Sequence, residues 1–200
     1  MMDIILAILL IIASYLFGSV STAIIASKLF NFPDPRHHGS KNPGTTNVLR
    51  LAGKIPAAFT LLGDVLKGLL PVVIAKAPGL SDGWLVCVAI AAIVGHMFPV
   101  YYQFRGGKGV ATAMGIYLGL NPVIGLAVLA TWLSVAFASN ISSVSAMIAV
   151  LFAPFYFYLV TQSGSLGFGL LAVTALIYWK HIPNIQRLLM GTESKIKDDA

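Results

Sequence analysis

The short segment 104–109 reads Phe-Arg-Gly-Gly-Lys-Gly and combines the residue types that bind phosphate. Its three glycines let backbone N–H groups converge, and Lys108 adds an ammonium group at the start of an apolar helix, whose N-terminus itself favours an anion. The segment is not a Walker A loop, because Tyr102 and Gly109 stand where that motif needs glycine and then serine or threonine. It therefore predicts a phosphate cradle that is not an NTPase site. The simpler alternative is a glycine-rich turn between two helices.

A second phosphate-binding candidate is the loop 31–50, which is dense in glycine, serine, threonine and asparagine. Small turn residues allow backbone amides to form an anion-binding concavity. Arg50 can offer two parallel hydrogen bonds to a phosphate, and Ser40, Thr46 and Asn47 can add side-chain hydrogen bonds. The composition alone also fits an ordinary solvated loop, which leaves both interpretations open.

Two ionisable residues, Asp64 and Lys67, interrupt an apolar stretch. They are three positions apart and therefore share one helical face. Ionisable side chains inside a membrane segment are costly unless they pair with one another. We expect a structural ion pair that fixes helix packing, with a functional role as the alternative.

Polar residues also follow the ends of other apolar stretches. His181 and Asn184 come directly after the last one, where His181 could act as a base or hydrogen-bond a phosphate. Ser143 lies where the chain returns after Asn140, and helix N-capping is its simpler role. His96 ends an apolar stretch, where a hydrogen-bonded core histidine is the simpler interpretation.

Several other chemistries lack their residues in this sequence. No cluster of His, Cys, Asp or Glu has metal-ligand spacing, so we expect no metal and no cofactor. There is no G-x-S-x-G nucleophile elbow. No carboxylate pair recurs in the loops, which argues against a proton-relay transporter. The single Cys87 excludes a disulfide framework.

The composition places these residues in a membrane protein. Of 200 residues, 58% are hydrophobic, 13 are Lys or Arg and 7 are Asp or Glu, and the mean hydropathy is +0.86. Soluble domains carry about a quarter charged residues. The 10% found here excludes a soluble enzyme, a disordered chain and a nucleic-acid-binding module. We expect one integral membrane domain, residues 1–200, in a lipid bilayer.

Seven apolar stretches are candidates for membrane helices. Six approach or exceed the about 20 residues that a spanning helix needs: residues 4–27, 55–76, 84–104, 122–139, 143–161 and 165–180. The seventh, 109–120, is roughly 18 Å long as a helix and either crosses with its flanks or forms a re-entrant half-helix. The predicted fold class is an all-α polytopic membrane bundle of about seven helices, or five if two weak segments do not cross.

The positive charges indicate how this bundle is oriented. Eleven of the 13 Lys and Arg residues lie in the first long loop, in the segment 105–108 and in the C-terminal tail. The positive-inside rule makes that face cytoplasmic. Because the first loop and the tail share a face, the number of spans is odd. Seven spans place the N-terminus outside and the C-terminus in the cytoplasm, and the net charge of +6 then needs no nucleic-acid partner.

Four segments, in order, resemble the bacterial acyl-phosphate:glycerol-3-phosphate acyltransferases (the PlsY family). They are DPR and GSKNPGTTNVLR in 34–50, GDVLKG in 63–68, GHMFP and FRGGKGVAT in 95–112, and HIPNIQRLL in 181–189. The resemblance covers nearly the whole chain. Thr45 stands where the family usually has alanine, and Ile182 and Pro183 replace a more polar run.

This resemblance implies an activity and a place for it. A fatty acyl group passes from acyl-phosphate to the 1-hydroxyl of glycerol 3-phosphate, giving lysophosphatidic acid and inorganic phosphate, the first acylation of phospholipid synthesis. The implied fold is a seven-helix bundle in the bacterial inner membrane with its active site on the cytoplasmic face.

The resemblance also assigns residues to the site. The implied catalytic residues are Ser40, Arg50, Lys108, His181 and Asn184. Arg50 and Lys108 would bind phosphate, and Ser40 and Asn184 would orient hydroxyl or carbonyl oxygens. Further phosphate-binding candidates are Thr46, Asn47, Gly106, Gly107 and Ser143.

Three questions stay open at the level of sequence. The general base is either His181 or the phosphate of the substrate itself. A transporter of a small phosphorylated solute, or an acyltransferase that uses acyl-CoA or acyl-carrier protein, would also use phosphate-binding loops. The sequence leaves the oligomeric state open, and a monomer is compatible with it.

Overall fold

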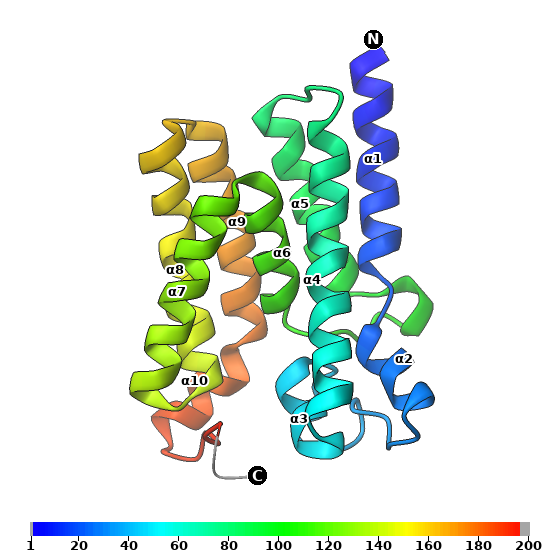
Figure 1. Ribbon diagram of the computed structural model, residues 1–200, viewed down its shortest axis with the longest axis vertical. Coiled ribbons are helices and arrows are strands. Elements are labelled where there is room, and N and C mark those ends of the chain that lie inside the picture. The colour runs from blue at the N-terminus through cyan, green and yellow to red at the C-terminus, as the bar shows by residue number, and fades with distance from the viewer. Residues whose placement is uncertain (1, 197–200) are drawn as a thin grey trace.

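The computed structural model describes residues 2–196, which form helices and loops without a strand (Figure 1). The predicted all-α fold class is confirmed. In chain order the helices are α1 Met2–Gly18, α2 Thr22–Leu29, α3 Thr45–Ala52, α4 Lys54–Lys76, α5 Asp82–Met97, the 3-10 helix η1 Val100–Tyr102, α6 Val110–Leu120, α7 Pro122–Ser139, α8 Ser142–Thr161, α9 Gly164–Lys180 and α10 Ile182–Leu189.

Within the described residues, five helical segments are long and apolar enough to cross a membrane. They are Asp3–Leu29, Lys54–Lys76, Asp82–Tyr102, Pro122–Ser139 and Ser142–Thr161. A sixth is counted if α9 and α10, which are bent by 55°, form one span. Each of these segments overlaps an apolar stretch predicted from the sequence.

Helix α6 is the short apolar segment, at 11 residues, or roughly 17 Å of helix. It lies among α4, α5, α7 and α8 rather than on the outside of the bundle (Figure 1). Its neighbours enclose it, so its length need not match the thickness of a bilayer.

The outer faces of the long helices expose apolar side chains. Leu9 is 59% exposed on α1, Ile74 is 55% exposed on α4, and Phe137 is 93% exposed on α7. Side chains of this kind on all sides of a bundle indicate a lipid environment, because water would disfavour so large an apolar surface.

The first apolar stretch, predicted as one helix over 4–27, breaks after Gly18. A Cβ at Gly18 would lie 2.4 Å from the carbonyl oxygen of Ala92, so α1 and α5 touch backbone to backbone there. The break frees backbone carbonyl groups, and that of Val20 accepts a hydrogen bond from the Lys67 ammonium at 2.9 Å. This hydrogen bond joins α4 to the segment between α1 and α2.

Two short helices lie outside the apolar stretches that were predicted to be helical. Helix α3 begins after Gly44 and is followed by its C-cap residue Gly53, whose φ of +82° suits glycine. Helix α10 begins at Ile182 with Pro183 in its first turn, a favourable position for proline. Both are only 8 residues long and lie beside the cavity described below.

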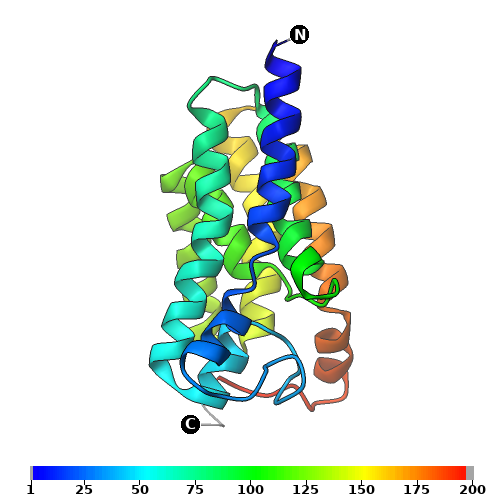
Figure 2. The same cartoon turned by 90° about the vertical axis from the view of Figure 1, so that its right-hand side faces the viewer.

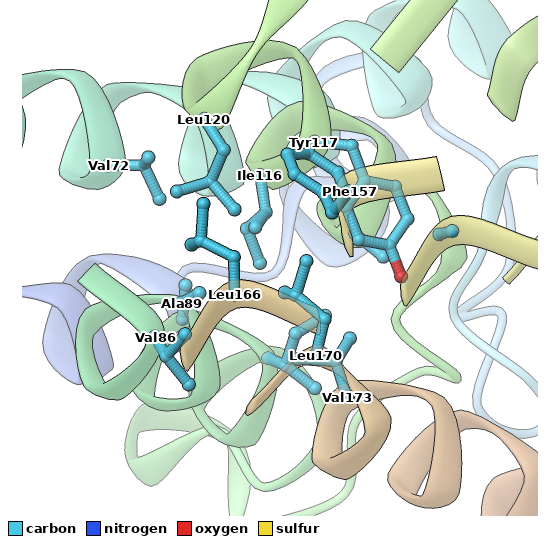
Figure 3. Close-up of a cluster of buried hydrophobic side chains, with 14 of the residues drawn as sticks. Val72, Val86, Ala89, Ile116, Tyr117, Leu120, Phe157, Leu166, Leu170 and Val173 are labelled. Atoms are coloured by element: carbon cyan, nitrogen blue, oxygen red, sulfur yellow. The ribbon is translucent and has the colours of Figure 1, made fainter. Parts of the chain in front are cut away.

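The hydrophobic core is built around α6. Figure 3 shows Ile116, Tyr117 and Leu120 of α6 facing Phe157 of α8 and Leu170 of α9. The rings of Tyr117 and Phe157 lie 5.9 Å apart. This core packs α6 against α8 and α9.

Glycine brings α4 and α6 into backbone contact. A Cβ at Gly68 would lie 2.0 Å from the Thr112 carbonyl oxygen, and one at Gly115 would lie 1.9 Å from that of Val65. Gly115 and Gly119 have the G-x-x-x-G spacing of a helix-packing motif, and both face α4. This close contact sets the position of the Lys108 loop relative to Asp64.

The two ends of the bundle differ in composition. Helices α3 and α10 and the segments 30–44 and 190–196 lie at one end, away from the N-terminal end of α1 (Figures 1 and 2). The connection between α4 and α5 lies at the other end (Figure 1). The end with α3 and α10 carries most of the positive charge, as the sequence predicted, and holds the cavity.

Candidate active site

A cavity of about 380 Å³ opens among α3, α4, α6, α7, α8 and α10. Its wall has polar and apolar parts. The polar part is formed by Ser40, Asn42, Thr45, Thr46, Asn47, Arg50, Asp64, His96, Lys108, Ser142, Ser143, His181, Asn184, Arg187, Glu193 and Ser194. The apolar part is formed by Leu61, Val65, Val110, Ala111, Met114, Leu129, Trp132, Leu133 and Ala146.

Most of the residues that the resemblance assigned to the site meet in this one cavity. All five implied catalytic residues line it: Ser40, Arg50, Lys108, His181 and Asn184. Three of the five further phosphate-binding candidates also line it: Thr46, Asn47 and Ser143. Gly106 and Gly107 are not among the lining residues.

The polar wall is organised by a chain of hydrogen bonds that ends in Glu193. The Lys108 ammonium donates to Oδ1 of Asn184. The amide nitrogen of Asn184 donates to Oε1 of Glu193 at 2.5 Å. Ser143 Oγ donates to the same oxygen at 2.6 Å, and Arg187 Nε donates to Oε2 at 2.7 Å. One carboxylate thus ties α8, α10 and the Lys108 loop together.

Burial and neighbouring charges act on the Lys108 ammonium. Burial, the largest cause, and the positive Arg187 and Lys180 lower the pKa of Lys108 to about 8, while Glu193 opposes them. A lysine with this pKa is still mostly protonated at neutral pH. It therefore offers a partly desolvated positive charge, which attracts an anion more strongly than an exposed one.

The Glu193 carboxylate stays ionised beside these groups. Burial alone would raise its pKa, but the hydrogen bonds from Ser143, Asn184 and Arg187 outweigh burial and hold the pKa of Glu193 below its usual range. The carboxylate partly balances the surrounding cations.

Arg50 lies on α3 and also lines the cavity. Its Nη2 donates to the backbone carbonyl of Lys195 at 2.8 Å, which ties α3 to the C-terminal tail. On the same helix, Thr46 Oγ1 lies 3.3 Å from Ser142 Oγ on α8. Helix α3 thus lies against both the tail and the start of α8.

Asn47 shapes the loop that carries Ser40. Its Nδ2 lies within 3.1 Å of the carbonyl oxygens of Pro35, His38 and Asn42. Its Oδ1 accepts from the backbone N–H of Ser40 at 3.0 Å. The amide predicted to bind phosphate is therefore already used by its own loop.

Gly39 allows this loop to close around Asn47. Its φ is +61°, and a Cβ there would lie 2.2 Å from Oδ1 of Asn47. Both the backbone conformation and the close approach favour glycine at this position. The glycines that the sequence linked to phosphate thus include one that serves the loop's own packing.

Gly106 and Gly107 pack against His96 instead of the cavity. The Gly107 N–H donates to the His96 carbonyl at 3.2 Å. A Cβ at Gly107 would lie 2.3 Å from Nε2 of His96, and one at Gly106 would lie 2.0 Å from the His96 carbonyl oxygen. These glycines let the loop fold back on the end of α5, which leaves Lys108 to face the cavity.

Asp64 and Lys67 form the ion pair that their spacing indicated. Lys67 Nζ lies 2.8 Å from Oδ1 of Asp64, and both side chains are 4% exposed or less. Nδ1 of His96 lies 3.8 Å from the same oxygen, too far for a hydrogen bond. Because Lys67 also reaches the Val20 carbonyl, the pair joins α4 to the break between α1 and α2.

His181 is held in one tautomer by the end of α9. Its Nδ1 lies 2.7 Å from the Ile177 carbonyl oxygen. A carbonyl can only accept, so Nδ1 carries the proton and Nε2 of the neutral ring keeps its lone pair. His181 therefore brings a possible proton acceptor to the cavity.

Among the residues of the polar wall that the predicted site left out are Arg187 and Glu193. Glu193 lies in the tail beyond the segments that carried the resemblance, and Arg187 lies within the last of these segments but was given no role in the site. Glu193 is the single glutamate of the chain, and its place between the cations Arg187 and Lys195 could have drawn attention to it. Its convergence with Ser143, 50 positions away, is visible only in the structure.

The wall suits a phosphorylated substrate that also has an apolar part. Arg50, Lys108 and Arg187 supply positive charge, and hydroxyl and amide groups surround them. Among residues 2–196, no group of three His, Cys, Asp or Glu side chains could hold a metal ion. The apolar wall adjoins the cations, so a single ligand can contact both.

Comparison with known proteins gives the family. Residues 8–191 match the family model described as glycerol-3-phosphate acyltransferase. The chain belongs to the glycerol-3-phosphate acyltransferase family. This confirms the resemblance that the four sequence segments indicated.

Curated relatives of this family match the chain over most of their length. The glycerol-3-phosphate acyltransferase of Thioalkalivibrio sulfidiphilus is 56% identical over 192 residues, which cover 96% of this chain and 94% of the relative. That of Methylococcus capsulatus is 49% identical over 188 residues, which cover 94% and 95%.

Solved structures share the fold of this family member. The crystal structure of PlsY, an integral membrane glycerol 3-phosphate acyltransferase, in its glycerol 3-phosphate form superposes with a TM-score of 0.90 at 35% identity, covering 94% of both chains. Its lysophosphatidic acid form gives a TM-score of 0.88 at 34% identity. The chain is accordingly an integral membrane acyltransferase.

The buried ion pair leads to a stability prediction. Asp64→Asn or Lys67→Met alone leaves one charge buried without its partner, which costs roughly 3–5 kcal/mol. The double variant removes both charges and should recover a large part of the loss. Thermal unfolding of the purified protein in detergent measures the three variants.

Lys54→Met is the matched control, because Lys54 is an exposed lysine of the same helix. It should unfold close to the wild type. Single variants as stable as Lys54→Met would show that the Asp64–Lys67 pair does not hold α4 in place.

Proposed function

We propose that the cavity transfers a fatty acyl group from acyl-phosphate to the 1-hydroxyl of glycerol 3-phosphate. The products are lysophosphatidic acid and inorganic phosphate, and the reaction is the first acylation of phospholipid synthesis. One observation carries the proposal: a wall rich in cations and hydroxyl groups continues into an apolar wall inside one cavity. Acyl-phosphate needs both, because its phosphate is anionic and its chain is apolar.

The phosphate groups of the two substrates lie at the polar wall. Arg50 and Lys108 bind them and stabilise the leaving phosphate. Ser40 and Asn184 orient hydroxyl or carbonyl oxygens. Thr46 and Ser143 add hydroxyl groups, whereas Asn47, Gly106 and Gly107 act by shaping the loops that present Ser40 and Lys108.

The acyl chain lies along the apolar wall. Leu129, Trp132 and Leu133 lie on α7 between one and three turns from its end at Ser139, so they lead from the polar wall into the bundle. Leu133 is 54% exposed and Leu61 is 45% exposed. An apolar chain can therefore reach this wall from the lipid.

The chemical step needs little covalent help from the protein. The hydroxyl oxygen of glycerol 3-phosphate attacks the acyl carbonyl carbon, and the bond from that carbon to the phosphate oxygen breaks. The hydroxyl proton passes to a base, and phosphate leaves with the bonding electron pair. Because acyl-phosphate is an activated mixed anhydride, positioning and charge stabilisation can supply most of the rate enhancement.

The polar groups are concentrated at one end of the bundle, which favours an enzyme over the transporter considered above. Alternating access needs binding groups that can be reached from either side.

A donor comparison tests the proposed reaction. Purified protein is incubated with labelled glycerol 3-phosphate and, separately, acyl-phosphate, acyl-CoA or acyl-carrier protein. We expect labelled lysophosphatidic acid from acyl-phosphate, in an amount equal to the phosphate released. The same assay with Arg50→Gln, in which one cation of the wall is lost, should lose most of the product. Product from acyl-CoA or acyl-carrier protein but not from acyl-phosphate would reject the proposed donor.

The proton acceptor is either Nε2 of His181 or the phosphate of glycerol 3-phosphate, and His181→Ala separates them. If Nε2 takes the proton, the single-turnover rate falls roughly 100-fold or more. If the substrate phosphate takes it, the rate stays within a few-fold of the wild type. The control is His37→Ala, which removes an exposed histidine that does not line the cavity.

We propose that the cavity faces the cytoplasm and that the protein lies in the bacterial inner membrane with seven membrane segments, its N-terminus outside. The clustered cations at the cavity end support this orientation.

Labelling of single cysteines tests the orientation, in a Cys87→Ala background. In spheroplasts, an impermeant maleimide should label Ser81→Cys, between α4 and α5. It should label Arg105→Cys, near the cavity, only after permeabilisation. The reverse pattern would contradict the proposed orientation.

A further inference from the structure

The Glu193 carboxylate has an unusual setting for a residue of a C-terminal tail. Its side chain is only 7% exposed. It accepts hydrogen bonds from Ser143 on α8 and from Asn184 and Arg187 on α10. Nearby, the Ile196 N–H donates to the Asn140 carbonyl at 2.7 Å, which fastens the tail beyond Glu193. The tail is thus held against the cavity on both sides of the carboxylate.

Glu193 determines which way the Asn184 amide points. The amide nitrogen faces the Glu193 carboxylate, and the amide oxygen faces the Lys108 ammonium. Rotating the amide by 180° would set oxygen against carboxylate and NH₂ against ammonium, and both contacts would be repulsive. The carboxylate therefore fixes the acceptor to which the Lys108 side chain is bound.

Glu193 also offsets the positive charge around Lys108. The charged groups that act on the Lys108 ammonium are Arg187 and Lys180, which disfavour its protonated form, and Glu193, which favours it. Lys108 in turn acts on the neighbouring His181. Arg50 shares the cavity. A carboxylate among these cations keeps the ammonium charged in a partly desolvated place.

We propose that Glu193 is a positioning residue for phosphate capture, holding the Lys108 ammonium at the cavity through the Asn184 amide. This inference rests on the proposed function, in which Lys108 binds a substrate phosphate. Glu193 itself need not touch the substrate. Its effect reaches the reaction through the orientation and charge of Lys108.

The test is the pH dependence of kcat/KM for glycerol 3-phosphate. This quantity reports groups of the free enzyme, and it should fall as the pH rises through the Lys108 pKa of about 8. Glu193→Gln removes a negative charge, so the fall should move to lower pH by about half a unit or more. Arg187→Gln removes a positive charge, so the fall should move to higher pH.

The opposite signs of these shifts separate positioning from damage to the fold. A variant that is only partly folded loses amplitude at every pH and keeps its midpoint. Lys195→Gln is the matched control, because it removes a tail cation whose backbone carbonyl, rather than side chain, is used by Arg50. Its midpoint should stay at the wild-type value.

Binding provides a second readout that needs no turnover. The Kd of the purified protein for glycerol 3-phosphate, measured across the same pH range, should show the same two shifts. If the wild type makes no lysophosphatidic acid from acyl-phosphate but the Kd shifts are present, the proposed reaction fails and the positioning role stands. If the wild type is active and the midpoints of both variants equal that of Lys195→Gln, the positioning role is wrong.

If Glu193→Gln cannot be recovered as a monodisperse protein, Glu193→Asp replaces it, because the shorter side chain keeps the charge but draws the carboxylate away from the Asn184 amide. A Kd for glycerol 3-phosphate above that of Lys195→Gln supports the proposal, and an equal Kd overturns it.

Discussion

Charged side chains in an apolar bundle need partners, and this constraint shapes the whole cavity end of the molecule. Asp64 and Lys67 are buried together as an ion pair. Lys67 also donates a hydrogen bond to the Val20 carbonyl, which lies at the break after α1. At the cavity, Lys108 is bound by Asn184, which is bound by Glu193. Hydrogen bonds within the protein lower the free-energy cost of placing the phosphate-binding cations in this bundle. These hydrogen bonds are formed before a substrate binds.

Glycines allow close backbone contacts, and these contacts place the charged side chains beside their partners. Gly107 folds its loop onto His96, and Gly68 and Gly115 let α4 and α6 approach until backbones touch. The result is a short buried helix that begins next to Lys108. A site built from such contacts is preorganised, which matters for a reaction that depends on positioning more than on covalent chemistry.

Much of the fold could be predicted because lipid imposes a simple requirement. Every backbone polar group must be satisfied inside a segment, so apolar stretches of sufficient length become helices. Six predicted stretches therefore coincide with the long helices. The break at Gly18 and the short helices α3 and α10 could not be predicted, because contacts with distant residues such as Ala92 and Glu193 stabilise them rather than local hydrophobicity.

The sequence by itself determined that this protein lies in a membrane, that its helices cluster their cations at one end, and that it belongs among glycerol-3-phosphate acyltransferases. Hydropathy, charge placement and short motifs are local properties and can be read one segment at a time. Only the tertiary structure decided which polar groups share the cavity. In the structure, the Asn47 amide hydrogen-bonds within its own loop, and Gly106 and Gly107 pack against His96. Glu193 accepts hydrogen bonds from Asn184 and Ser143. Such pairings depend on where helices far apart in the chain meet, and no local pattern records that.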